Sequence, residues 1–348
     1  MAATFSPEPL IPQPLKESNP PQILMKKVVV IGGGTGNFTV LSGLKHYNVD
    51  LSAIVSMADD GGSTGILRDE LGVLPPGDVR QCLVALSNSS RLMRSLMNYR
   101  FENGGLGGHS FGNLLLSSLE KVTGSFEKAI EEAGKILSIK GKVIPVTTHQ
   151  ARLKMVLENG TILEGEGQIY TSKEIEKGYK NIYLEPFPKV NDRAIDEIMN
   201  ADLVVLGPGG LYTSLVPILL VDGISKALRD TKAKKVFVVN LMNRKGQTGN
   251  LKLSDYLLEM QRFAGKDIFD YILINNRAPP EKLIKLYELE ANLVENNLVS
   301  DKRIILADLL SEETTEYSQS DVLAKHRAFI RHDSEKLARE LMNLVDNL

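Results

Sequence analysis

Residues 26–37 read KKVVVIGGGTGN, an apolar segment that runs directly into a cluster of glycines. The β-branched residues 28–31 are typical of a strand buried on both faces of a parallel sheet. The glycines predict a tight turn, and the apolar residues after it recur at helical spacing. Because backbone N–H groups point outward at a helix N-terminus, a strand, a glycine turn and a helix together form an anion site. We therefore expect a phosphorylated ligand here, with the candidate residues Gly33, Gly34, Thr35, Gly36 and Asn37.

This glycine cluster departs from two well-known nucleotide motifs. Asn37 stands where the dinucleotide fingerprint G-x-G-x-x-G has its last glycine, so an NAD-dependent oxidoreductase is the weakest of the functions considered. No Gly-Lys-Ser/Thr follows, which argues against NTP hydrolysis at a P-loop. A tight strand-to-helix connection without a ligand is the alternative interpretation.

Composition excludes several classes of protein. The 348-residue chain has a formal net charge of −2, so no basic surface predicts nucleic acid as a partner. Cys82 is the only cysteine; it falls in an apolar helix, predicts no disulfide framework and fits a reducing cytoplasm. Residues 1–24 carry six prolines, which predicts a disordered leader rather than a secretory signal. Segment 203–221 is uncharged but is interrupted at 207–210 and at Pro217, so we expect no membrane insertion.

Strand and helix patterns alternate along most of the chain. Strands are expected at 28–31, 51–57, 142–148, 203–206, 236–239, 271–274 and 303–307, with a helix from the second glycine loop to Leu228 and a closing helix at 333–345. This predicts an α/β fold, a doubly wound, mostly parallel Rossmann-like sheet with helices on both faces. The alternation breaks at about 151–190, where segments 153–157 and 161–170 flank an Asn-Gly turn and 180–184 adds a strand, predicting a small antiparallel insertion. We expect a single domain over 25–348.

Polar and glycine-rich clusters follow the predicted strands. In such sheets ligands bind outside the carboxyl ends of the strands, at the point where the strand order reverses. A second glycine loop facing the first would suit a diphosphate. The further candidate ligand-binding residues at strand ends are Asp59, Asp60, Gly61, Gly62, Ser63, Gly209, Gly210, Leu211, Tyr212, Thr213, Asn240 and Asn276.

The acidic pair Asp59 and Asp60 has three interpretations. One carboxylate could accept hydrogen bonds from a ribose. Both could help to hold Mg²⁺ together with ligand phosphate oxygens. The third interpretation is a simple turn, which Asp-Gly sequences favour. Mg²⁺ is the one cofactor considered, and none is required.

Four further polar residues lie on loops that open helices. Asp78 and Arg80 could position or neutralise phosphate charge, but Asp78 could equally cap the helix after Pro75–Gly77. His109 could be an acid–base group, but no partner carboxylate is visible, so we expect it to pack a loop or to contact the ligand. Asn113 both donates and accepts at a helix start, which favours ligand contact. No nucleophile–base pair emerges, so the sequence predicts binding better than catalysis.

Five segments then resemble one family: IGGGTGN, MADDGGSTGILRDELGVLPPGDVRQCL, GHSFGNLLL, LGPGGLYTSLVPILL and VNLMN. In order over about residues 26–330, they resemble the YvcK-type branch of the CofD-like family. The resemblance implies a Rossmann-like fold. For CofD-type members it implies a Mg²⁺-dependent transferase that moves a phospholactyl group from a guanylylated donor to a deazaflavin coenzyme precursor. For YvcK-type members it implies a cytoplasmic protein that binds UDP-sugars such as UDP-N-acetylglucosamine and is linked to gluconeogenic growth, cell shape and peptidoglycan precursor supply.

The LYTS loop and the Asp-Asp-Gly-Gly-Ser and Pro-Pro-Gly-Asp segments follow the YvcK branch. The resemblance thus implies a non-enzymatic regulator whose partner is an enzyme of amino-sugar or cell-wall precursor synthesis, and which could be a homo-oligomer. The alternative is a Mg²⁺-dependent phosphoryl- or nucleotidyl-type transferase with Asp59 and Asp60 at the metal. Two departures stand out: Gly210 replaces a serine of many relatives, and Gly249–Leu251 and Lys285–Tyr287 stand where some relatives contact the sugar nucleotide through an aromatic residue and an arginine.

Overall fold

The computed structural model describes residues 25–287, 291–312 and 330–348, and the predicted leader of residues 1–24 lies outside this part of the chain. The central sheet contains β1 (Lys27–Gly32), β2 (Asp50–Val55), β3 (Lys142–Pro145), β7 (Leu203–Leu206), β8 (Lys234–Val238), β10 (Tyr271–Asn275) and β12 (Ile304–Ala307). Two small sheets contain β4 (Arg152–Leu157), β5 (Ile162–Glu164) and β6 (Tyr179–Glu185), and β9 (Met242–Arg244) with β11 (Ala291–Leu293).

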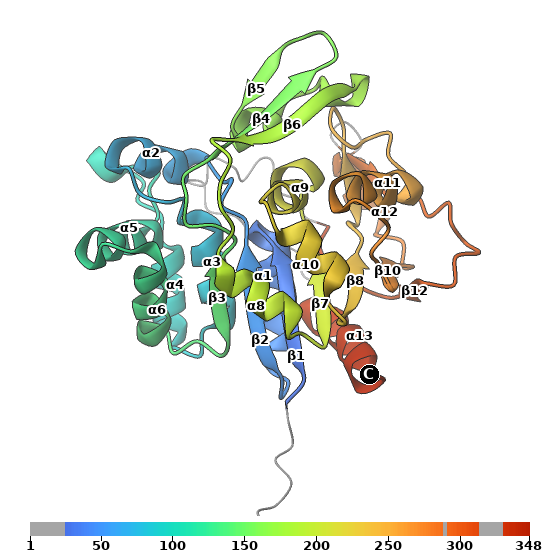
Figure 1. The fold of residues 1–348 in the computed structure, drawn as a ribbon, viewed down its shortest axis with the longest axis horizontal. Coiled ribbons are helices and arrows are strands. Elements are labelled where there is room, and N and C mark those ends of the chain that lie inside the picture. Colours follow the sequence, from blue (N-terminus) through green and yellow to red (C-terminus); the bar gives the residue numbers. More distant parts are fainter. Residues whose placement is uncertain (1–24, 288–290, 313–329) are drawn as a thin grey trace, which may run out of the picture.

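Helices surround the central sheet. They are α1 (Gly34–Leu44), α2 (Gly62–Leu71), α3 (Gly77–Leu86), α4 (Arg91–Asn98), α5 (Phe111–Thr123), α6 (Phe126–Ile136), α7 (Glu166–Thr171), α8 (Asp192–Met199), α9 (Val216–Leu219), α10 (Ile224–Asp230), α11 (Leu253–Ala264), α12 (Glu281–Tyr287) and α13 (Ser334–Asp346), with the short turns η1 (Gly104–Leu106), η2 (Ile175–Lys177) and η3 (Leu211–Leu215). In Figure 1, α8 and α10 lie in front of the sheet, and the β4–β5–β6 sheet lies at the top.

The strand order of the central sheet is β12-β10-β8-β7-β1-β2-β3, and all neighbouring pairs are parallel. The chain adds β2 and β3 on one side of β1 and then crosses to add β7, β8, β10 and β12 on the other side. The strand order therefore reverses between β1 and β7, which is where this type of fold binds ligands. The predicted doubly wound, mostly parallel Rossmann-like fold is confirmed.

The two strands at this reversal are apolar along their buried length. Each residue of 28–31 in β1 and of 203–206 in β7 is at most 1% exposed, as expected for strands covered on both faces. Behind them α1 packs against α13. Gly43 of α1 permits this approach, because a Cβ there would lie 2.0 Å from the carbonyl oxygen of Ser334.

Four predicted segments differ from the structure. Segment 161–170 is not one strand: β5 ends at Glu164, and Gly165, at φ +90°, turns the chain into α7. Ile169 of that helix is fully buried, so its burial favours the helix over an exposed strand. The predicted helix to Leu228 is divided into η3, α9 and α10, with Gly223 at φ +96° before the last of them. The expected strands over 51–57 and 142–148 end earlier, at Val55 and Pro145.

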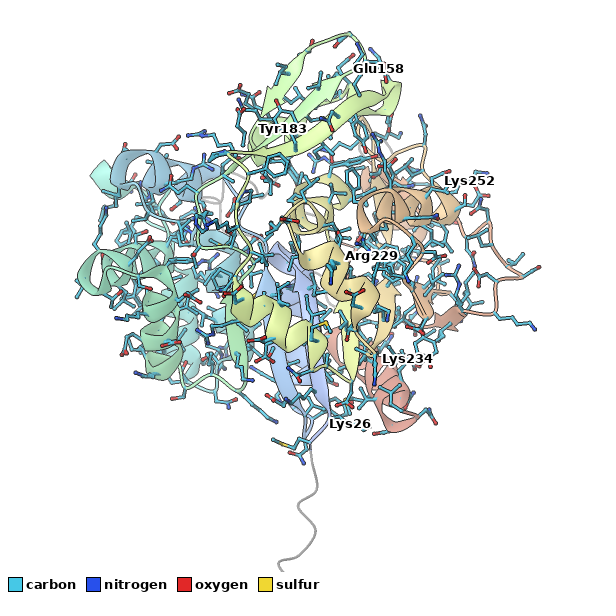
Figure 2. The ribbon with its side chains drawn as sticks, in the orientation of Figure 1. Lys26, Glu158, Tyr183, Arg229, Lys234 and Lys252 are labelled. Atoms are coloured by element: carbon cyan, nitrogen blue, oxygen red, sulfur yellow. The ribbon has the colours of Figure 1, made fainter. Side chains whose placement is uncertain are left out.

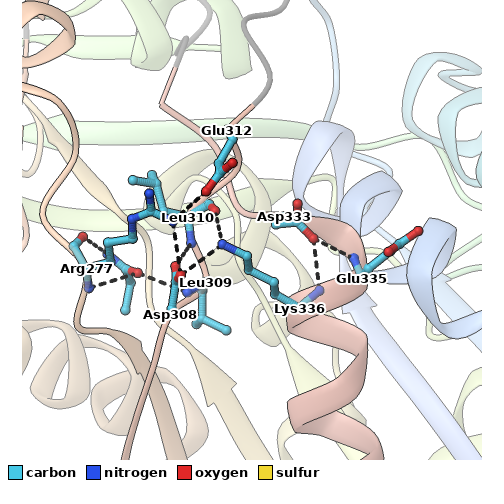
Figure 3. Close-up of polar contacts among 9 residues, drawn as sticks. Arg277, Asp308, Leu309, Leu310, Glu312, Asp333, Glu335 and Lys336 are labelled. Atoms are coloured by element: carbon cyan, nitrogen blue, oxygen red, sulfur yellow. Dashed lines mark hydrogen bonds and ion pairs between the residues drawn. The ribbon is translucent and has the colours of Figure 1, made fainter.

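Polar contacts fasten the periphery of the fold. Lys26 and Lys234 lie near the amino ends of the strands, far from Glu158 and Tyr183 in the antiparallel sheet (Figure 2). Lys234 pairs with Asp270 at 2.9 Å. At the far edge, Asp308 accepts from both Arg277, at 3.1 Å, and Lys336 of α13, at 2.9 Å (Figure 3). These contacts tie the C-terminal helix to the ends of β10 and β12.

The length and composition of the helices bear on membrane insertion. No single helix in the described part of the chain is long and apolar enough to cross a bilayer. The pair Leu211–Leu219 and Ile224–Asp230 would together be long and apolar enough, but the two helices are bent by 76° relative to each other.

Candidate ligand-binding site

A cleft of about 1260 Å³ is lined by loops that follow β1, β2, β7 and β8. It therefore lies at the carboxyl ends of the strands, beside the reversal of strand order. The predicted residues that line it are Gly33, Gly34, Thr35, Gly36, Asp59, Asp60, Gly61, Gly62, Ser63, Asp78, Arg80, Asn113, Gly209, Gly210, Thr213 and Asn240. Most of the residues singled out from the sequence thus meet in one cavity.

The two glycine loops touch each other directly. A Cβ at Gly36 would lie 1.8 Å from the carbonyl oxygen of Pro208, in the loop after β7. Backbone meets backbone here, so no side chain can be accommodated without moving one of the loops. The glycine at position 36 is therefore required by loop packing, whatever the ligand.

The Asp78 side chain packs against the first glycine loop and forms a hydrogen bond with it. Gly34 has φ +57°, a conformation that favours glycine, and its N–H donates to the Asp78 carboxylate. A Cβ at Gly33 would lie 2.3 Å from Asp78 Oδ2. The residue at the cap position of α3 is Pro76, so the interpretation of Asp78 as that helix's cap is wrong. Its carboxylate instead occupies part of the anion position at the N-terminus of α1.

Buried carboxylates make the floor of the cleft acidic. Burial, and then the neighbouring Asp59 charge, raises the pKa of Asp78 well above its usual range. Burial likewise raises the pKa of Asp59, against a hydrogen bond of 3.0 Å from the Gly61 N–H. The pKa of Glu166 on α7 is also raised well above its usual range, first by burial and then by the charges of Asp59, Asp78 and Asp60. Such a cluster favours protons or cations in the cleft.

The acidic pair predicted for Mg²⁺ is partly used within the protein. Asp60 Oδ1 accepts from the N–H of Gly167 at 2.7 Å, and Asp60 Oδ2 lies 3.8 Å from Arg68 Nη2. Among the described residues no group of three or more His, Cys, Asp or Glu side chains has the arrangement of a metal site. Because Mg²⁺ commonly combines one or two carboxylates with ligand phosphates, a Mg²⁺ ion here would need oxygens from the ligand.

Four predicted residues form one buried network. Arg80 Nε donates to Asn113 Oδ1 at 3.0 Å, and Asn113 Nδ2 donates to Ser63 Oγ at 3.2 Å. The Ser63 hydroxyl lies 3.1 Å from His109 Nδ1. Because a hydroxyl both donates and accepts, this contact can form with the imidazole proton on either ring nitrogen. His109 is buried and does not line the cleft, so it packs the loop rather than meeting the ligand.

Asn240 holds the second glycine loop. Its Oδ1 accepts from the Gly209 N–H at 2.9 Å, and its Nδ2 donates to the Gly209 carbonyl at 2.9 Å. The Gly209 N–H is therefore already used. Phosphate oxygens over this loop would have to meet the N–H groups that follow it, at the start of η3.

Four other predicted residues do not line the cleft. Asn37 and Leu211 are buried beneath the two loops. Tyr212 is also buried, with its ring edge-on to Tyr179 at 5.3 Å between centroids. Asn276 is exposed after β10. These residues shape the site from behind or lie away from it.

The structure adds lining residues that the sequence analysis missed. Arg68 of α2 is 5% exposed, and its Nη1 has no hydrogen-bond partner within the described part of the chain. The Arg244 guanidinium lies 3.7 Å from the centroid of the Tyr170 ring, and both residues line the cleft, as do Glu166 and His332. None follows a strand of the central sheet at a spacing that would have identified it; Tyr170 and Glu166 fall where a strand was expected.

Comparison with known proteins places the chain among its relatives. Residues 28–343 match the family model described as 2-phospho-L-lactate transferase CofD. The chain is 45% identical over 252 residues to a gluconeogenesis factor of Halalkalibacterium halodurans, with 72% of this chain and 77% of that protein covered. It is 36% identical over 325 residues to the gluconeogenesis factor of Bacillus subtilis, with 92% and 98% covered. A crystal structure of a UPF0052 family member from Bacillus halodurans matches with a TM-score of 0.83 at 37% identity, covering 92% of this chain and 100% of that one. The chain therefore belongs to the CofD family.

Proposed function

We propose that the cleft binds a UDP-sugar of the UDP-N-acetylglucosamine type and that the protein is a regulator linked to gluconeogenic growth. The observation that carries the proposal is the convergence of two glycine loops, after β1 and β7, on one cleft at the reversal of strand order. Residues of the first turn of α1 and around the start of η3 line that cleft, where N–H groups that are not already paired could bind a phosphate. The relatives named gluconeogenesis factor supply the cellular role.

In the proposed complex the diphosphate lies over the first turn of α1 and the start of η3. Thr35 and Thr213 flank it from the two loops. Ligand binding would fix the loops relative to each other and favour one conformation, which a partner enzyme of cytoplasmic amino-sugar or cell-wall precursor synthesis could recognise. Through that partner the protein would influence cell shape and precursor supply.

The second candidate is a transferase of phosphorus-containing groups, in line with the description of the family model. The raised pKa values of Asp59 and Asp78 favour it, because such carboxylates hold a proton or a cation near a phosphoryl group. Mg²⁺, if bound by ligand phosphates and these carboxylates, would supply charge neutralisation.

A ligand screen separates the candidates. UDP-N-acetylglucosamine, UDP, GDP and NAD are titrated calorimetrically with and without Mg²⁺, and the ligand is then recovered and analysed by mass spectrometry. Saturable binding of UDP-N-acetylglucosamine with intact recovery supports the regulator. Mg²⁺-dependent consumption of a nucleotide supports the transferase. Binding of NAD alone contradicts both.

One variant tests the position of the phosphates. Thr35→Glu places a carboxylate in the first turn of α1, where the helix dipole favours it, so we expect the fold to persist. The same carboxylate repels a diphosphate, and we expect affinity to fall at least tenfold, while Thr35→Ser stays within about twofold. Equal affinity of Thr35→Glu and wild type would place the phosphates elsewhere.

A further inference from the structure

Besides Arg68 Nη1, a second buried nitrogen in the cleft wall, His332 Nε2, has no hydrogen-bond partner among the described residues. His332, which precedes α13 in the chain, lines the cleft and is 9% exposed, and its Nε2 makes no hydrogen bond to any residue that the structure describes. Buried polar atoms in native proteins nearly always have a partner, so each exception needs an explanation. Here the unpaired atom lies in the wall of the candidate ligand site.

The chemistry of this nitrogen is set by the rest of the ring. The imidazole donates to the carbonyl of Val239, and burial lowers the pKa of His332 to about 4. The ring is therefore neutral at physiological pH. With Nδ1–H as the donor to Val239, Nε2 carries the lone pair and can only accept.

The neighbouring amides on the same wall are already paired. Both polar atoms of Asn240 bond to Gly209. Asn243 Oδ1 accepts from the Tyr256 hydroxyl at 2.8 Å, and Asn243 Nδ2 donates to the Leu251 carbonyl at 2.8 Å. His332 Nε2 is thus the acceptor left over at this end of the cleft among these three side chains.

A hydrogen-bond acceptor repels phosphate oxygens, because these also carry lone pairs. His332 Nε2 therefore needs an N–H or O–H donor from the ligand. The phosphates belong at the helix N-termini of the glycine loops, so the opposite polarity at His332 orients the nucleotide. Arg244, which also lines the cleft, has a flat guanidinium with one face over the Tyr170 ring, and bases stack on such planar groups. Building on the proposed function, we propose that His332 Nε2 accepts a hydrogen bond from the N3–H of the uracil base and so determines base specificity.

The test uses a ligand altered at one atom. UDP-N-acetylglucosamine and its N3-methyluridine analogue are titrated calorimetrically against wild type, His332→Phe, His332→Gln and the control His46→Phe, an exposed histidine on the loop after α1. For wild type and the control we expect N3-methylation to weaken binding at least tenfold. His332→Phe should bind the unmodified ligand about tenfold more weakly and be indifferent to methylation within twofold. His332→Gln, which keeps an acceptor, should retain part of the discrimination.

Thermal unfolding of each variant shows whether the fold persists. If His332→Phe does not fold, the comparison of wild type with His332→Gln decides the test. If methylation weakens wild type and the His332 variants equally, or weakens none of them, the role of His332 is wrong while UDP-sugar binding stands. If wild type does not bind UDP-N-acetylglucosamine at all, the proposed function fails and the role of His332 fails with it.

Discussion

The glycine loops after β1 and β7 look alike in sequence but differ at one glycine. In the first loop each glycine meets the protein itself: Gly36 meets the Pro208 carbonyl, Gly33 meets the Asp78 carboxylate, and Gly34 has φ +57°. In the second loop Gly207 has φ +79° and a Cβ at Gly210 would lie 2.2 Å from Thr213 Oγ1, but Gly209 is under no such constraint. A Cβ there would have its nearest neighbour at 3.5 Å, on Ser214, which is ordinary contact, and its φ is not in the left-handed region.

The difference changes what a glycine motif means. The first loop's glycines are explained by folding alone, since each one relieves a clash or permits a left-handed turn. They therefore do not identify a ligand. Gly209 has no folding reason to be glycine, so a ligand that passes close to the backbone becomes the better explanation for it.

The largest expected effect comes from Gly36→Ala. A methyl group 1.8 Å from the Pro208 carbonyl forces the two loops apart, and we expect the free energy of unfolding to fall by about 3 kcal/mol. Urea denaturation measures it. The control is Gly105→Ala, where a Cβ meets open space and the change should stay within about 0.5 kcal/mol. Equal stability of the two variants would show that the loops do not touch as described.

A smaller effect of opposite sign is expected for Asp78→Asn. The folded-state pKa of Asp78 lies above its unfolded value of about 4. As pH rises, the unfolded chain releases this proton first, so ionisation of Asp78 lowers stability between those two pKa values. Asparagine has no ionisable carboxyl, so the variant does not lose stability in this way. Its side-chain oxygen can still accept the hydrogen bond from the Gly34 N–H. We expect the variant to be about 0.5–2 kcal/mol more stable than wild type at pH 8, with the difference shrinking toward pH 4.

The control for this prediction is Asp346→Asn, which removes an exposed carboxylate at the end of α13. Its stability relative to wild type should not change with pH by more than about 0.5 kcal/mol. If Asp78→Asn is destabilising at pH 8, the carboxylate is a necessary support of the first loop. If it stabilises and also weakens ligand binding, Asp78 is kept for function at a cost in stability.

The parts of the site that follow strands could be predicted from the sequence, and the parts on peripheral segments could not. The apolar run 28–31 and the polar clusters after strands located the sheet and most of the cleft, because parallel strands bring their carboxyl ends to one edge. Glu166 and His332 were missed because they reach the cleft from a peripheral helix and from the segment before α13, and only tertiary packing places them there. The strand expected over 161–170 was wrong because Gly165, at φ +90°, redirects the chain so that Ile169 can be buried.

The smallest stability effect and the most specific binding effect are expected from Gly209→Ala. The added methyl meets only ordinary contacts in the ligand-free protein, so urea denaturation should show a change within about 0.5 kcal/mol. If a diphosphate lies against this backbone, the same methyl occupies its space, and calorimetric affinity for UDP-N-acetylglucosamine should fall at least tenfold. Unchanged binding would make the second loop a structural turn like the first. Lost binding with an intact fold would assign Gly209 to the ligand. The glycines of the first loop allow no such test, because they cannot be changed without disturbing the fold.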